Sequence, residues 1–302
     1  MHIFLTGGNG FIGKHVMKDL LSHGHTVLAL ARTDVSAIAL AATGAQVHLG
    51  DIKDLDCLRE AVKNVDAVIH LAYGSVVGGF EKASAVDRAA IAAMGGALGR
   101  GKPLLIASET SGVDAGEGEG GGVADEDSQP DGTSFLKVRH LSAEMVGELC
   151  REKGVKGMIV RLAPLIHGRR DTSAFIPEIT AFAKKNGRVI YIKNANAVWP
   201  AVHVADAASL FRLAMEKDSK GAIYNAVGEE GVAVRDLIEV IGQKVDVPVE
   251  GVSAEEARRE SGVWTSFLGM HGRTSSEKTR RELGWVPMGP GVFKDMEDNY
   301  VW

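Results

Sequence analysis

The stretch Thr6-Gly7-Gly8-Asn9-Gly10-Phe11-Ile12-Gly13 decides the fold, because it connects a buried strand to a helix. The apolar segment Ile3–Leu5 precedes it and is typical of a strand. After it come a helical pattern that ends at Gly24 and a second apolar run, Val27–Ala31. In such a strand–turn–helix–strand unit, backbone N–H groups of the turn and the positive end of the helix can bind a pyrophosphate.

The glycines of this stretch satisfy two spacings at once, Gly8-x-Gly10-x-x-Gly13 and Gly7-x-x-Gly10-x-x-Gly13. Either spacing alone occurs in many simple turns, but the surrounding strands and helix make this one specific for a dinucleotide. We predict cofactor contacts from Gly7, Asn9, Gly10, Phe11, Ile12 and Gly13, with Gly10 closest to the pyrophosphate.

The composition excludes several classes of protein. The chain has 302 residues, of which 45% are hydrophobic and 24% charged, as in ordinary globular proteins. A formal charge of −5 and the lack of a basic cluster argue against a nucleic-acid partner. No apolar run approaches the ~18 residues of a membrane span. The first strand leaves no room for a signal peptide, and two cysteines make no disulfide framework, so we expect a cytoplasmic protein.

Buried strands alternate with helices over the first half of the chain. Apolar runs occur at Ile3–Leu5, Val27–Ala31, Val47–Leu49, Ala67–Ala72, Leu104–Ala107 and Met158–Leu162. Strands that are apolar throughout favour a parallel sheet covered by helices on both faces. We therefore predict an α/β fold with a Rossmann-type, doubly wound parallel sheet.

The segment from Gly112 to Thr133 breaks this alternation. It is rich in Gly, Asp and Glu, so it has little apolar surface to bury, and we predict a mobile loop. The loop follows the fifth strand, whose carboxyl end faces the ligand side of a doubly wound sheet. Both a solvated linker and a loop that orders over substrate stay open.

Motifs along nearly the whole chain resemble the extended, epimerase/dehydratase-like branch of the short-chain dehydrogenase/reductase superfamily. In order, they are the glycine stretch, Gly50-Asp51-Ile52, His70-Leu71-Ala72, Ser108, Arg161-Leu162-Ala163-Pro164-Leu165-Ile166-His167-Gly168, His203-Val204-Ala205-Asp206, and Ser275-Ser276-Glu277-Lys278 with Leu283-Gly284-Trp285-Val286-Pro287.

This resemblance implies a division of the chain into two parts. A dinucleotide-binding Rossmann core is expected over residues 1–168, with 200–228 returning to it. A smaller, interwoven substrate-binding portion is expected over 169–199 and 229–302. The resemblance also implies that Asp51 and Ile52 meet the adenine, and that Leu71, Ala72 and Pro164 contact the cofactor.

The superfamily's usual catalytic pair is a tyrosine followed four residues later by a lysine, and this chain lacks it. None of its four tyrosines has a lysine at that distance. With Glu144 setting the register, the two positions hold Leu136 and His140. The usual tyrosinate proton transfer is therefore not expected here.

Other side chains are candidates for the proton transfer. His140 titrates near neutrality and would face the nicotinamide ribose, although a surface contact with Glu144 is the favoured interpretation. Ser108 and Thr110, at the end of the fifth strand, either bind a substrate oxygen or cap the local turn. Tyr73 is a further proton-donor candidate. His203 is expected to position the helix after it.

The end of the second strand, Leu30-Ala31-Arg32-Thr33-Asp34, bears on the choice of cofactor. Arg32 can bind a 2′-phosphate, with Thr33 adding a hydroxyl, which favours NADP. Asp34 keeps NAD open, because an acidic residue here binds the ribose hydroxyls.

Three functions fit these observations. The first is an NAD(P)-dependent oxidoreductase acting on a small carbonyl or alcohol. The second is a nucleotide-sugar epimerase or dehydratase, for which only Arg169 and Arg170 suggest a diphosphate clamp. The third is a catalytically silent redox sensor. We expect a small-molecule substrate and no metal, and a homodimer stays open.

Overall fold

Seven parallel strands form one sheet in the order β10-β6-β5-β4-β1-β2-β3. The computed structural model describes all residues except 75–78, 117–121, 172–174, 218 and 261. The strand order reverses between β1 and β4, which is where a doubly wound sheet binds its ligand. The predicted Rossmann-type fold is confirmed. The strands are β1 (His2–Thr6), β2 (Thr26–Ala31), β3 (Gln46–Leu49), β4 (Ala67–His70), β5 (Pro103–Glu109), β6 (Lys156–Leu162) and β10 (Ile223–Ala226).

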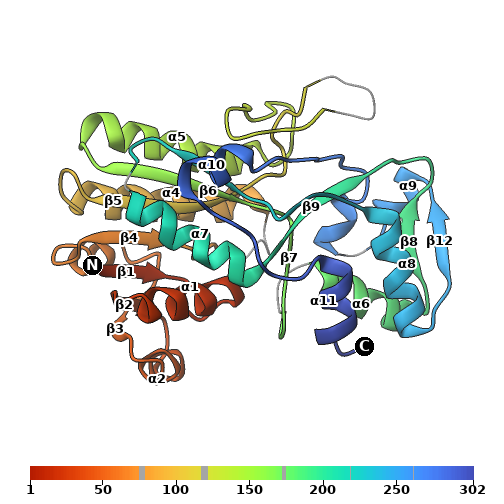
Figure 1. Ribbon diagram of the computed structural model, residues 1–302, viewed down its shortest axis with the longest axis horizontal. Helices are drawn as coiled ribbons and strands as arrows, with labels where there is room; N and C mark the ends of the chain where they lie inside the picture. The colour runs from red at the N-terminus through yellow and green to blue at the C-terminus, as the bar shows by residue number, and fades with distance from the viewer. Residues whose placement is uncertain (75–78, 117–121, 172–174, 218, 261) are drawn as a thin grey trace.

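Helices cover both faces of this sheet (Figure 1). One face packs on α1 (Phe11–Ser22) and α7 (Val204–Lys217), and the other on α3 (Leu55–Ala61), α4 (Phe80–Ala97) and α5 (Lys137–Glu152). Side chains of both faces are therefore buried, and Ile3, Phe4 and Leu5 are all fully inaccessible. No described helix is long and apolar enough to cross a membrane.

A second, smaller group of elements has its own hydrophobic cluster and lies to the right in Figure 1. It contains the sheet β11-β9-β7, the parallel pair β12-β8 and several helices. Between β9 and β11, the chain passes through α7 and β10 and so returns to the large sheet. The predicted boundaries near 168, 199 and 228 stay a prediction. The elements are β7 (Leu165–His167), α6 (Phe175–Asn186), β8 (Val189–Ile192), β9 (Val198–His203), β11 (Glu229–Ala233), α8 (Val234–Val245), β12 (Val249–Val252), α9 (Ala254–Ala257), a 3₁₀ turn (Val263–Ser266) and α11 (Val292–Asn299).

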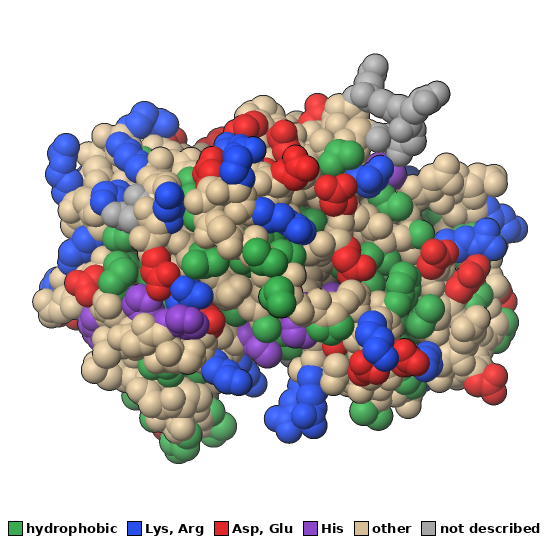
Figure 2. Space-filling model, viewed as in Figure 1, with side chains coloured by type: hydrophobic (Ala, Val, Ile, Leu, Met, Phe, Trp, Pro, Cys, Tyr) green, Lys and Arg blue, Asp and Glu red, His purple; other side chains and the backbone are tan. Residues whose placement is uncertain are grey.

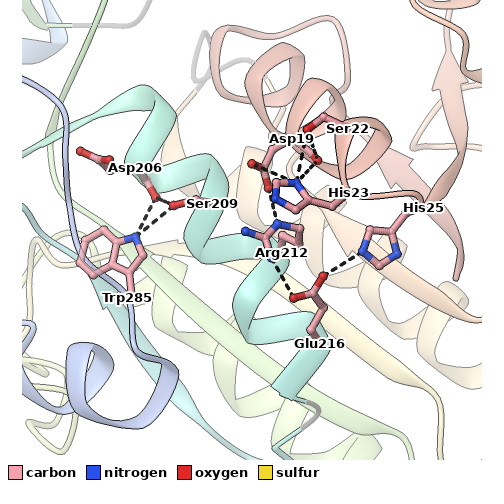
Figure 3. Close-up of polar contacts among 9 residues, drawn as sticks. All are labelled: Asp19, Ser22, His23, His25, Asp206, Ser209, Arg212, Glu216 and Trp285. Atoms are coloured by element: carbon pink, nitrogen blue, oxygen red, sulfur yellow. Dashed lines mark hydrogen bonds and ion pairs between the residues drawn. The ribbon is translucent and has the colours of Figure 1, made fainter.

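Ion pairs between charged side chains connect α7 to α1 (Figure 3). The Arg212 guanidinium bonds Asp19 of α1 at 2.7 Å through Nε and Glu216 at 2.8 Å through Nη1. Glu216 also pairs with His25 Nε2 at 3.0 Å. His203 acts at the start of α7, where its Nδ1 accepts a hydrogen bond from Ala205 N at 3.3 Å.

Asp206 anchors the segment that follows α10 (Glu277–Leu283). Its carboxylate accepts hydrogen bonds from Met288 N at 2.9 Å and Gly289 N at 2.8 Å. Its carbonyl accepts one from Trp285 Nε1 at 3.0 Å (Figure 3). Hydrogen bonds therefore connect the motif around Asp206 to the Leu-Gly-Trp-x-Pro motif.

The prediction of a mobile loop over Gly112 to Thr133 is wrong for residues 124–128. Glu126 is only 2% exposed, and its carboxylate accepts a hydrogen bond from Thr279 N at 2.8 Å. The Arg161 guanidinium donates to the carbonyls of Asp125 and Ser128. These long-range contacts order a turn whose own composition could not do so; residues 117–121 lie outside the described residues.

We predict that Asp206→Ala lowers the free energy of unfolding by about 2 kcal/mol, because two backbone N–H groups lose a charged acceptor. Urea denaturation followed by circular dichroism measures this change. Asp56→Asn, at a side chain that is 94% exposed, is the control and should change stability little. Equal stability of the two variants would contradict the role of Asp206.

Candidate active site

Two glycines make the turn after β1 too tight for a side chain. Gly7 has a φ of +75°, and a Cβ there would lie 2.8 Å from Ala72 N. A Cβ on Gly13 would lie 2.0 Å from Gly7 O. Gly10, directly before α1, is less confined, since its Cβ would meet only Gly7 O at 3.2 Å. The turn thus exposes backbone rather than side chains at the start of α1.

A cavity of about 380 Å³ lies over this turn, at the carboxyl ends of β1 to β4. Its volume is in the range of small-molecule sites. Nine residues that we singled out line it, and whether they bind a cofactor stays a prediction: Gly7, Asn9, Gly10, Arg32, Thr33, Asp51, Ile52, Ala72 and Tyr73.

The remaining predicted cofactor residues, Phe11, Ile12, Gly13, Leu71 and Pro164, are not part of this lining. Among the lining residues that we did not predict, Ser36 and Lys53 carry polar side chains on the same cavity wall as Arg32 and Asp51. Lys53 follows the Asp51-Ile52 pair directly, so its position in the sequence was a usable signal. Ser36 donates its backbone N–H to Thr33 Oγ1 at 3.2 Å, in a capping box at the start of α2 (Asp34–Ala41).

A second pocket, with a volume of only about 20 Å³, lies where the end of β5 faces the small sheet and the segment 267–274, and it has room for a single water molecule. It contains Thr110 and Pro164 from the predicted site. Its full lining is Thr110, Ser111, Gly112, Val113, Ala124, Pro164, Trp199, Pro200, Phe267, Met270, His271, Gly272 and Thr274.

Among the described residues, buried polar atoms without hydrogen-bond or ion-pair partners gather at this end of β5. They are Ser108 Oγ, Thr110 Oγ1 and His140 Nε2. Leaving such an atom unbonded costs about 1–3 kcal/mol, so proteins rarely tolerate several together without a reason. Binding of a ligand oxygen would be such a reason. The interpretation that the Ser108 and Thr110 hydroxyls cap the local turn is wrong, because neither hydroxyl bonds the described backbone around it.

The predicted surface contact of His140 with Glu144 is wrong. His140 is 3% exposed, whereas Glu144 points to solvent on the outer side of α5. Burial and the charge of Arg161 lower the pKa of His140, and the nearby backbone of Ser111 offsets only part of this shift. His140 is therefore a buried, neutral imidazole at pH 7, one turn after the fully buried Leu136.

A buried ion-pair network, which we did not predict, adjoins the site. Arg139 Nε lies 3.5 Å from Glu109 Oε1, and its Nη1 lies 3.7 Å from Asp87 Oδ2. Asp87 also pairs with His70 Nε2 at 3.2 Å. Burial raises the pKa of Glu109, although the charge of Arg139 opposes this. The participants come from β4, α4, β5 and α5, so no local pattern could reveal them.

Tyr73 belongs to the same region but directs its hydroxyl toward α4. Its OH lies 2.8 Å from Ser84 Oγ, and the Arg139 guanidinium lies 3.8 Å from the centre of its ring. Burial raises the pKa of Tyr73, which makes a tyrosinate unfavourable near neutral pH. Its role as a proton donor stays a prediction that this geometry does not favour.

Comparison with known proteins shows the family of this chain. Residues 3–227 match the model of the NAD dependent epimerase/dehydratase family, and the chain belongs to that family. This confirms the resemblance found in the sequence. Among the described residues, the fold and the cavity over the glycine turn agree with a family whose members are NAD-dependent enzymes.

Individual relatives differ in what is known of them. An uncharacterized protein of Schizosaccharomyces pombe is 38% identical over 297 residues, covering 98% of each chain. A UDP-glucose 4-epimerase of Halalkalibacterium halodurans is 27% identical and spans 100% of this chain and 95% of its own. The structure of dTDP-glucose 4,6-dehydratase from Streptomyces venezuelae, with NAD bound, has a TM-score of 0.78 at 20% identity, covering 99% and 95%.

We predict that Gly10→Val abolishes dinucleotide binding while the protein stays folded. The valine side chain would enter the cavity but meet little of the protein itself. Calorimetric titration should show an affinity at least about tenfold weaker.

Gly13→Ala is the matched comparison, because its Cβ would clash with Gly7 O and distort the turn. It should lower thermal stability as well as binding. Unchanged affinity in Gly10→Val would show that the pyrophosphate lies elsewhere.

Proposed function

We propose that this protein is an NADP(H)-dependent oxidoreductase that interconverts a small carbonyl compound and its alcohol without a tyrosine–lysine pair. The observation that carries the proposal is the set of unpartnered atoms on Ser108, Thr110 and His140 at the carboxyl end of β5. These atoms suit a substrate oxygen. The family membership supports hydride chemistry at this end of the sheet.

The glycine turn and the cavity over it fit a dinucleotide, because only a backbone without side chains admits a pyrophosphate so close to α1. When bound, the nicotinamide supplies or accepts the hydride. The hydroxyls of Ser108 and Thr110 would orient the carbonyl oxygen. His140, near the backbone after β5, would give a proton to that oxygen during reduction and take it back during oxidation.

The preference for NADP rests on the adenosine end of the cavity. Arg32, Thr33, Ser36 and Lys53 line it and supply two cations and two hydroxyls, a set that suits a 2′-phosphate. Asp34 is the first residue of α2 and is not part of the lining. The Streptomyces venezuelae structure holds NAD, so this preference would distinguish the present chain from that relative.

A nucleotide-sugar epimerase or dehydratase is the second candidate, favoured by the activities named for the two characterised relatives. Arg169 and Arg170, the suggested diphosphate clamp, line a different pocket with Tyr300 and Trp302. That separation from Thr110 favours the oxidoreductase. Dinucleotide binding without any turnover would instead favour a redox sensor.

We also propose that the protein acts on a small molecule and does not bind nucleic acid. On the face shown in Figure 2, positive and negative side chains are interspersed. Such a surface does not offer the continuous basic patch that nucleic acid requires.

We predict that Arg32→Ala weakens NADPH binding by about 10- to 100-fold, the usual value of a charge-assisted contact to phosphate. NADH binding should change little. Fluorescence titration with both cofactors measures the two affinities. Arg59→Ala, which removes a cation of α3 paired with Asp56 instead, is the control. Equal losses for NADPH and NADH, or a wild-type preference for NADH, would overturn the assignment.

We predict that His140→Leu lowers kcat by about 100-fold, within the usual range for general acid–base catalysis, and that Tyr73→Phe changes it only a few-fold. Because the pKa of His140 lies below its ordinary value, the imidazolium donor is present only in acid. Carbonyl reduction should therefore slow as the pH rises toward neutrality, and alcohol oxidation should accelerate over the same range.

His140→Leu should lose this pH dependence, which stopped-flow absorbance of NADPH at several pH values would detect. A large loss in Tyr73→Phe with intact cofactor binding, combined with an active His140→Leu, would reverse the assignment.

A further inference from the structure

We infer that the aromatic ring of Tyr73 is the wall against which the nicotinamide riboside half of the cofactor packs, and that Arg139 is the positioning residue that holds this ring. This inference rests on the proposed function, since it concerns the same cofactor, and it gives Tyr73 a binding role rather than a proton to transfer. It follows from the place of Tyr73 along the cavity, the contacts of its hydroxyl and the cation on its ring.

Tyr73 lies on the other side of the glycine turn from Arg32 and Asp51. In the large sheet β4 borders β1 on one side, and β2 and β3 lie on its other side. Arg32 follows β2 and Asp51 follows β3, whereas Tyr73 follows β4 and lines the same cavity. A dinucleotide with its pyrophosphate at the turn after β1 and its adenosine beside Arg32 extends its other half past β4. The nicotinamide riboside is therefore the part of the cofactor that reaches Tyr73.

Backbone contacts fix where the Tyr73 side chain begins. A Cβ on Gly7 would lie 2.8 Å from Ala72 N, so the glycine turn touches the backbone directly before Tyr73. Thr6 pairs with His70 in the register of β1 and β4, and its Oγ1 accepts a hydrogen bond from Ala72 N at 3.1 Å. Tyr73 is thus held one residue away from the turn that we expect to bind the pyrophosphate.

The hydroxyl of Tyr73 is occupied by contacts with α4. It lies 2.8 Å from Ser84 Oγ, on a side chain that is fully inaccessible, and 3.5 Å from Phe80 O. Tyr73 as a whole is only partly buried, and it lines the cavity. With the oxygen bonded to α4, the ring is the part of the side chain that is left to meet a ligand.

A guanidinium packs on the ring of Tyr73. Cζ of Arg139 lies 3.8 Å from the ring centre, well inside the ~6 Å range of a cation–π contact. The same guanidinium lies 3.5 Å from a carboxylate oxygen of Glu109 and 3.7 Å from one of Asp87, and the Arg139 side chain is 11% exposed. Since a guanidinium is planar and rigid, its two carboxylate partners also fix its orientation over the ring. The ring is therefore held at its hydroxyl and on one face before any ligand binds.

A ring held in this way favours a flat group beside it. Aromatic groups in contact attract each other beyond the area that they bury, and the nicotinamide ring is flat. A wall whose orientation is already fixed also loses little further entropy when a ligand packs against it. Loss of the ring should therefore weaken binding of the nicotinamide half and leave binding of the adenosine half unchanged.

The test compares NADPH with adenosine 2′,5′-bisphosphate, which lacks the nicotinamide riboside, in calorimetric titrations. Tyr73→Leu should weaken NADPH binding by about tenfold, because one aromatic contact is lost, and should not change the affinity for the bisphosphate. Tyr73→Phe keeps the ring under Arg139 and should bind NADPH within about threefold of the wild type. If the wild type binds NADH instead, NADH and ADP are the corresponding pair of ligands.

Tyr191→Leu is the matched control, because Tyr191 also lies under a guanidinium. Cζ of Arg235 is 5.1 Å from its ring centre, but Tyr191 belongs to β8 and is not part of the cavity lining. This variant should change neither affinity.

Two variants of Arg139 test its positioning role. Arg139→Met frees the ring and should weaken binding of NADPH but not of the bisphosphate, whereas Arg139→Lys keeps a cation at the ring and should restore most of the NADPH affinity. Weakening of NADPH binding to the same extent by both variants would contradict the role of the cation. If Arg139→Met does not fold because two buried carboxylates lose their partner, the Tyr73 variants test the wall without it.

The outcomes separate the two proposals. Equal weakening of NADPH and bisphosphate binding by Tyr73→Leu, or unchanged affinity for both, would overturn the inference about Tyr73 and leave the proposed function intact. NADPH binding without turnover of any carbonyl compound would overturn the proposed oxidoreductase and leave the Tyr73 wall intact. A wild-type protein that binds neither NADPH nor NADH would overturn both.

Discussion

The close approach of two backbone segments at the end of β1 is the constraint on which the rest of the structure depends. Gly7 packs against the backbone of Leu71 and Ala72, and Gly13 packs against Gly7 O, so a Cβ at either place would overlap main-chain atoms. This close contact places the start of α1 next to the point where the strand order reverses, between β1 and β4. It also explains why backbone atoms of the glycine turn line the cavity beside β4.

A second interaction connects this close contact to the far side of the site. Thr6 Oγ1 lies 2.6 Å from His70 Nδ1, and His70 pairs in turn with Asp87. Asp87 accepts a hydrogen bond from Ser142 Oγ at 2.5 Å, on the same helix that carries His140. Buried ion pairs contribute little net stability, but breaking one is costly. The network therefore fixes α5 relative to the glycine turn more than it stabilises the fold.

The sequence predicted the parts of the fold that depend on local pattern. Continuous apolar runs such as Leu104–Ala107 and Met158–Leu162 lie within the strands β5 and β6. The first helix, expected to end at Gly24, ends at Ser22, and Gly24 has a φ of +81°. The site residues on strand ends, Ser108 and Thr110, came from the same reasoning. They lie at the carboxyl edge of the sheet because every strand of it is parallel.

Long-range pairing explains what the sequence could not show. Arg139 resembles an ordinary solvent-facing residue of an amphipathic helix, and only the folded chain brings Glu109, Asp87 and Tyr73 around it. Likewise, the acidic segment 124–128 is ordered by Arg161 and Thr279, which are distant in sequence. His140 was misplaced for the same reason, since its burial depends on the backbone after β5 rather than on its own helix.

The most direct test of the account is a crystal structure of the ternary complex with NADP⁺ and a small alcohol that the enzyme oxidises. The account predicts the alcohol oxygen within hydrogen-bond distance of Ser108 Oγ, Thr110 Oγ1 or His140 Nε2, and the 2′-phosphate beside Arg32. An alcohol bound instead to a reoriented Tyr73 hydroxyl, or lodged beside Arg169 and Arg170, would contradict it.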